Sequence, residues 1–131
     1  MKRFIFLLII TLLPVMAASK NSGKLATDMR MMLTAMEAIQ KGGFYNCTSC
    51  MEDGVKQLKK GLDSMHSMDA KSFLPQHQAY AFKFAQKRAK MIEMYADDLV
   101  LSLKEQNQEE ALEDYALILK QCTSCHARMR R

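Results

Sequence analysis

Two stretches of the sequence repeat the four residues Cys-Thr-Ser-Cys, and both have the residue types and spacing to do chemistry. The upstream copy, Cys47–Cys50, is followed by Met51, and the downstream copy, Cys122–Cys125, is followed by His126. Two thiols separated by two residues can form a disulfide or bind a metal, and a histidine directly after them completes a covalent haem-attachment motif. The residue after each pair therefore predicts different chemistry for the two copies.

The downstream copy has the spacing with which Cys122 and Cys125 bond to haem while His126 binds the iron. At about 100° per residue, these three side chains fall within an arc of about 100° on a helix. We expect them to face the interior of a helical protein, where an apolar macrocycle would replace part of the core. Two alternatives stay open: a disulfide between these cysteines, or a zinc site built from both Cys-Thr-Ser-Cys copies.

The upstream copy has three competing interpretations. A local disulfide between Cys47 and Cys50 leads, because residues three apart at the start of a helix bring their Cα atoms to roughly 5 Å. Unsatisfied amides and the helix dipole stabilise a thiolate at such a position, so this disulfide could also cycle between oxidation states. The second interpretation is another haem with Met51 as a ligand, although the attachment motif of c-type cytochromes requires a histidine at that position. The third is metal binding or haem-delivery contact by free thiols.

Four helices are expected to position these residues, because apolar side chains recur at helical spacing along most of the chain. A capping box at Ser49-x-x-Glu52 would start the second helix, and Pro75 would start the third. The apolar stripe of the last helix includes Leu112, Leu119 and His126. No stretch alternates like a strand. The pattern predicts an all-α fold, an antiparallel four-helix bundle, in a single domain. The expected helices cover residues 25–41, 51–65, 75–104 and 109–131.

The first eighteen residues have the pattern of a cleaved signal peptide, with two basic residues, an apolar run too short for a comfortable membrane span, and small residues at the exit. We therefore expect a signal peptide over 1–18 and a haem-binding domain over 19–131, exported to the periplasm with no membrane anchor. Cleavage removes two of 19 basic residues and none of 14 acidic ones, which lowers the formal net charge from +5 to +3. The remaining charges are scattered, which does not indicate nucleic-acid binding.

The chain resembles the cytochrome c′ family, together with its low-spin relative cytochrome c556. The resemblance rests on Cys-Thr-Ser-Cys-His near the end of the last helix, Arg130 four residues after the histidine, and a first helix ending at Lys41-Gly42. It implies one covalent haem c held by Cys122 and Cys125, with His126 as proximal iron ligand and Arg130 near the proximal face. A second explanation for Arg130 is a cation that complements the helix dipole.

The same resemblance implies a protein that carries electrons or binds a diatomic gas such as nitric oxide, and that is not an enzyme. Its partners would be redox proteins or the gas itself, with a homodimer formed through the first two helices. The alternative function is a haem-free periplasmic thiol-disulfide or metal-handling protein that uses both Cys-Thr-Ser-Cys copies. A structural bundle with two short disulfides is a third hypothesis.

The distal side of the iron lies on the first helix in that family. Counting back from Lys41-Gly42 puts the family's distal position near Ala26, which cannot bind iron, so we expect a vacant site. A slip of one turn would bring Met29 there as a distal ligand, and a gap would bring Met32, although methionines also serve as core filler. Arg30 is a candidate partner for a haem propionate, or else part of a solvated helix face.

Overall fold

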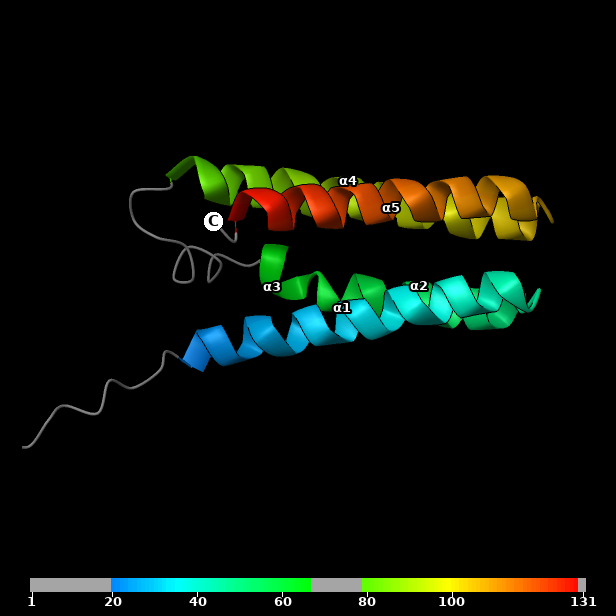
Figure 1. Cartoon of the computed structure of the whole chain (residues 1–131), viewed down its shortest axis with the longest axis horizontal. Coiled ribbons are helices and arrows are strands. Elements are labelled where there is room, and N and C mark those ends of the chain that lie inside the picture. The colour runs from blue at the N-terminus through cyan, green and yellow to red at the C-terminus, as the bar shows by residue number, and fades with distance from the viewer. Residues whose placement is uncertain (1–19, 67–78, 130–131) are drawn as a thin grey trace, which may run out of the picture.

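The computed structural model describes residues 20–66 and 79–129, which form helices and no strand (Figure 1). The all-α four-helix bundle predicted from the sequence is confirmed, with one additional short helix. The predicted signal peptide, the predicted helix start at Pro75, and Arg130 lie outside the described residues. The helices are α1 (Lys20–Phe44), α2 (Thr48–Gly61), α3 (Asp63–His66), α4 (Ala79–Lys104) and α5 (Gln108–Met129).

The four long helices form two hairpins that run along the long axis of the molecule. Helix α1 packs chiefly along α2, and α4 packs chiefly along α5 (Figure 1). Contacts of α2 with α4 and of α1 with α5 join the two hairpins. The connections α1–α2 and α4–α5 lie at one end of the bundle, whereas the start of α1 and the end of α5 lie at the other (Figure 1). In the described part of the chain, no helix is both long and apolar enough to cross a membrane.

Two glycines on α2 allow the backbones of the first hairpin to approach closely. A Cβ atom on Gly54 would lie 3.1 Å from the carbonyl oxygen of Ala35 and 2.7 Å from the side chain of Ile39. A Cβ atom on Gly61 would lie 3.2 Å from the carbonyl oxygen of Asp28 and would overlap the side chain of Met32. A larger residue at either place would push α1 and α2 apart, so glycine sets their separation.

The core follows the predicted helical stripes in the first hairpin and departs from them in α5. Its largest fully buried side chains come from α1, α2, α4, α5 and the residue that follows α2: Ile39, Met51, Leu58, Leu62, Leu99 and Ile118. In α5 the predicted stripe is partly wrong, since Leu112 and Leu119 are exposed while Ala111, Asp114 and Gln121 are buried. The packed face of α5 is therefore centred about one residue before the predicted one.

The start of α2 also differs from the prediction. Helix α1 continues through its two glycines to Phe44, and Asn46 then adopts a left-handed backbone conformation with φ of 52°. This turn brings Cys47 to the N-cap position, where its sulfur accepts a hydrogen bond from the backbone N–H of Cys50. The predicted capping box at Ser49 is therefore wrong, because the capping residue is Cys47, two residues earlier, and the helix begins at Thr48.

Candidate functional site

A cavity of about 250 Å³ lies between the two hairpins, in the half of the bundle that holds the start of α1 and the end of α5. Methionine and aliphatic side chains from α1, α3, α4 and the residue after α2 form most of its wall. Polar groups come mainly from α5, which contributes Cys122, Thr123, Cys125 and His126, and from Arg88 of α4. An apolar cavity with a few converging polar groups is the usual form of a cofactor site.

The predicted haem-attaching residues all line this one cavity. Cys122 and Cys125 are half-buried free thiols, and His126 reaches the cavity wall from a more exposed position. The predicted arc of α5 therefore faces the junction between the hairpins, whereas Ile118 and Gln121 face the packed core. This explains why the predicted stripe and the buried face of α5 differ. Part of that stripe lines the cavity.

The two thiols of the cavity are protonated near neutral pH. Burial raises the pKa of Cys122 to about 11, with a smaller contribution from neighbouring Cys125. Burial also raises the pKa of Cys125, against an opposing effect from the positive charge of Arg88. A thiolate is the species that binds zinc or attacks a disulfide, so this environment opposes both reactions and keeps two neutral thiols beside an apolar space.

Three methionines of α1 line the opposite wall of the cavity: Met29, Met32 and Met36. Leu112 of α5 packs directly on Gly43 of α1, since a Cβ atom on this glycine would lie 2.8 Å from its side chain. The two helices are antiparallel, so going back along α1 and forward along α5 from that contact leads to the same end of the bundle (Figure 1). Met29 lies 14 residues before Gly43 on α1, and His126 lies 14 residues after Leu112 on α5. At 1.5 Å per residue, each is about 21 Å from the contact. Met29 is therefore roughly level with the histidine.

Two residues expected near the distal side do not line the cavity. Ala26 is exposed, so the position expected from the ungapped count does not face the cavity. Arg30 is also exposed and does not line the cavity. Both lie off the face of α1 that carries Asp28 and Met32, which are buried against the rest of the bundle. Among the predicted distal residues, Met29 and Met32 are the ones that line the cavity.

Arg88 is a site residue that the sequence analysis did not identify. Its guanidinium donates a hydrogen bond to the side-chain carbonyl of Gln121 and lies 4.8 Å from the ring centre of Phe84, which Arg128 approaches to 4.6 Å. Its Nε atom is buried without a hydrogen-bond partner in the described part of the chain. A buried donor of this kind is costly unless an acceptor reaches it. The sequence feature that could have identified Arg88 is its position within the apolar stripe of α4.

These features fit a haem better than a metal ion alone. An apolar space, two thiols, an imidazole and an unsatisfied cationic donor at the wall match a flat macrocycle with carboxylates at one edge. Among residues 20–66 and 79–129, no group of three or more His, Cys, Asp or Glu side chains could hold a metal ion.

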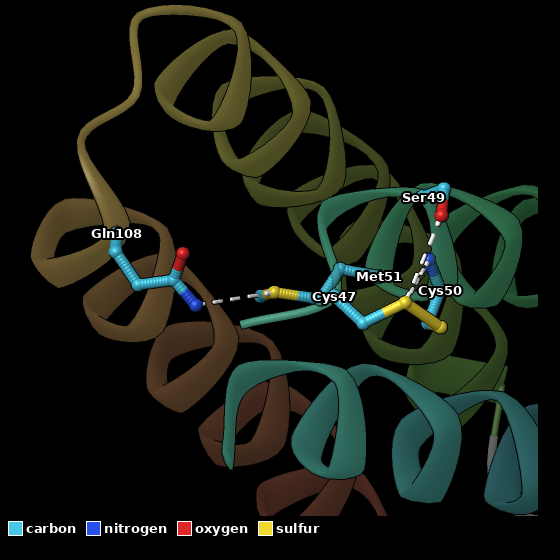
Figure 2. The surroundings of a disulfide bond; sticks show 5 residues. All are labelled: Cys47, Ser49, Cys50, Met51 and Gln108. Carbon is cyan, nitrogen blue, oxygen red and sulfur yellow. Dashed lines mark hydrogen bonds between the residues drawn. A yellow bond between two sulfur atoms is a disulfide. The ribbon is translucent and has the colours of Figure 1, made fainter. Parts of the chain in front are cut away.

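The upstream cysteines lie at the other end of the bundle. Cys47 and Cys50 form a disulfide with a Cα–Cα distance of 5.2 Å, which agrees with the predicted closeness of the two residues (Figure 2). The side chain of Gln108, the first residue of α5, donates to the sulfur of Met51 at 3.8 Å. From there to Cys122 the helix rises about 21 Å. The two cysteine pairs are therefore too far apart to share one zinc ion.

Met51 is not available as the ligand of a second haem at the upstream site. Its side chain is fully buried in the core, and Gln108 covers its sulfur (Figure 2). The disulfide also occupies both thiols that such an attachment would need.

The chain matches no protein-family model, no curated protein and no solved structure.

Proposed function

We propose that this chain is a periplasmic monohaem c-type cytochrome of the cytochrome c′ type. Cys122 and Cys125 would hold one haem c through thioether bonds, and His126 would be the proximal iron ligand. One observation carries the proposal: the three attaching groups, predicted from the sequence alone, line a single apolar cavity. When bound, the haem would supply one-electron redox chemistry and a coordination position for a ligand.

The residues around the cavity have distinct roles in this proposal. The aliphatic side chains exclude water from the macrocycle and so favour the less charged state of the iron. Arg88 replaces Arg30 as the partner of a haem propionate, because its buried Nε needs an acceptor. A carboxylate there would receive a charge-assisted hydrogen bond and fix the orientation of the cofactor edge.

The level of Met29 with His126 changes the expected coordination. We assign the thioether of Met29 as the distal ligand in place of a vacant position at Ala26, because Met29 lines the cavity and Ala26 does not. Methionine and histidine together raise the reduction potential of a c-type iron. A filled sixth position suits electron transfer with redox partner proteins better than binding of nitric oxide.

Intact mass after expression with haem-maturation machinery tests the attachment. The mature chain should carry the mass of one haem, and the Cys122→Ser/Cys125→Ser variant should carry none. A matched Cys47→Ser/Cys50→Ser variant should retain the full haem mass. An apoprotein mass for the wild-type chain would overturn the proposal and favour a haem-free thiol-disulfide or metal-handling protein. The mass of a signal-free chain in the periplasmic fraction tests export.

Ferrous spectra with and without carbon monoxide test the distal assignment. The wild-type protein should give a low-spin spectrum that does not change when carbon monoxide is added. The Met29→Leu variant should give a high-spin spectrum that shifts when the gas is added. Met36→Leu is the matched control, because this residue lines the same wall about two turns farther along α1. A wild-type spectrum that shifts with carbon monoxide would show a vacant site and restore the gas-binding function.

A further inference from the structure

The Cys47–Cys50 disulfide lies outside the haem proposal and at the opposite end of the bundle. We propose that it is a redox-active site, which exchanges with the dithiol of an exported partner protein. This inference does not depend on haem binding, because it rests on the geometry of the turn between α1 and α2. It makes the protein a carrier of a two-electron redox group.

The two sulfur atoms of this disulfide differ in their surroundings. Cys50 is exposed, whereas Cys47 is half-buried and caps α2. The Cys47 sulfur accepts the backbone N–H of Cys50 at 3.3 Å and lies 3.7 Å from the hydroxyl of Ser49 (Figure 2). Donors at the start of a helix stabilise negative charge on sulfur. Cys47 is therefore the better leaving group, and Cys50 is the accessible sulfur for attack.

The turn that carries the disulfide is held by hydrogen bonds that do not involve the sulfur–sulfur bond. The backbone N–H of Cys47 donates to Gly42 at 2.9 Å, and the backbone N–H of Met51 donates to Cys47 at 3.1 Å. The side chain of Gln108 ties the turn to α5 through the carbonyl of Gly43 at 3.4 Å. The disulfide joins residues of one helical turn and no two separate elements. It can open without unfolding the bundle.

Two large, exposed aromatic side chains directly precede the turn that carries this disulfide. Phe44 is 80% exposed and Tyr45 is 75% exposed, and both precede Cys47 within three residues. Aromatic residues are enriched at the centres of protein–protein interfaces, where they bury large areas at low entropic cost. Their position at the tip of the first hairpin fits a protein partner, and a small thiol would make no use of them.

The exchange proceeds in two balanced steps. A thiolate of the partner attacks the Cys50 sulfur, which forms a mixed disulfide and releases Cys47 as a thiolate held by the N–H of Cys50. The second thiol of the partner, as a thiolate, then attacks the partner's own sulfur and releases Cys50. The products are the partner disulfide and two cysteines on this chain, which take up the two protons that the partner thiols lose. Two electrons move to this protein.

Peptide mapping makes the test independent of the haem site. Trypsin cleavage after Lys41 and Lys56 yields one peptide that holds Cys47 and Cys50 but neither cysteine of the cavity. The folded, oxidised mature protein is incubated with glutathione, quenched with acid and digested. The expected adduct is on Cys50. A disulfide that resists excess glutathione until denaturant is added, or an adduct on Cys47, would overturn the proposal.

Alkylation of the reduced protein at neutral pH supplies a second readout. Cys47 should react faster than Cys50, because the donors at the N-cap increase its thiolate fraction, and the lower nucleophilicity of the more acidic thiol offsets only part of this gain. Ser49→Ala should reduce this ratio, whereas Thr48→Ala, an exposed neighbour in the same turn, should leave it unchanged. Equal rates for the two cysteines would show that the N-cap does not favour the thiolate.

The docking role of the aromatic residues has its own control. In the Phe44→Ser/Tyr45→Ser variant, reduction by a thioredoxin-type protein dithiol should slow by at least tenfold, while reduction by glutathione stays unchanged. Far-UV circular dichroism verifies that this variant is folded. If both rates stay unchanged, or both fall together, the aromatic pair is not a docking surface and a protein dithiol is not the partner.

Discussion

Replacement of Gly54 by alanine should destabilise the bundle, although the same change stabilises most helices. Glycine costs a helix interior about 1 kcal/mol relative to alanine, which sets the expected gain. At Gly54, however, the new methyl group would lie 3.1 Å from backbone atoms of both Ala35 and Ile39 and 2.7 Å from the Ile39 side chain. Ile39 is fully buried and cannot move aside into solvent. Overpacking of this kind costs about 1–3 kcal/mol, and after the gain of about 1 kcal/mol is subtracted we expect a net loss of up to about 2 kcal/mol.

Urea unfolding of the mature protein, followed by far-UV circular dichroism, measures this loss. With a denaturant dependence of about 2 kcal/mol per molar, the midpoint should fall by up to about 1 M. Gly23→Ala is the matched control, because a Cβ atom on Gly23 would meet nothing within 4 Å, and its midpoint should rise slightly. A midpoint that rises equally for Gly54→Ala would refute the close approach of α1 and α2.

Three further predictions concern the charged and cysteine residues. Burial raises the pKa of Asp114, so its folded-state pKa lies above the unfolded value of about 3.9. The stability of the protein should therefore fall as pH rises from about 4 through the folded-state pKa of Asp114. Asp114→Asn should raise the melting temperature at pH 7 and flatten this decline. Arg88→Leu should lower the midpoint potential of the haem protein, because it removes a positive charge that favours the reduced iron, whereas Arg30→Leu should leave it unchanged in a spectroelectrochemical titration. Cys47→Ser/Cys50→Ser should cost at most about 2 kcal/mol in urea unfolding, because the loop that this disulfide closes is very short.

Sequence periodicity predicted the fold well where helices pack on one face only. The stripe Met51, Val55, Leu58, Leu62 and Met65 is buried throughout, because α2, Leu62 and α3 pack against one surface made by α1 and the second hairpin. The capping residue of α2 was not predictable from periodicity. It depends on the left-handed turn that precedes Cys47, which a pattern of apolar residues does not encode.

The predicted haem-attaching residues of α5 line one cavity, whereas only some of the residues predicted to face them do so. Cys122, Cys125 and His126 share one arc of a single helix, so local geometry sufficed to bring them to one cavity. The distal side depends on how α1 and α5 are aligned, which the packing of Leu112 on Gly43 decides. Arg88 depends on the docking of α4 on α5, and sequence spacing carries no information about either register.

The division of the bundle into two tightly packed hairpins has a consequence for folding. Most helix–helix contacts join neighbours in sequence, so each hairpin should assemble early and rapidly, before the two dock. The cavity lies in the seam between them, so docking of the two hairpins alone would leave the apolar side chains of the cavity wall without packing partners. A bound cofactor would therefore stabilise the last step of assembly more than the hairpins themselves. In amide hydrogen-exchange measurements on the cofactor-free protein, the amides at the seam should accordingly exchange first and those within each hairpin later.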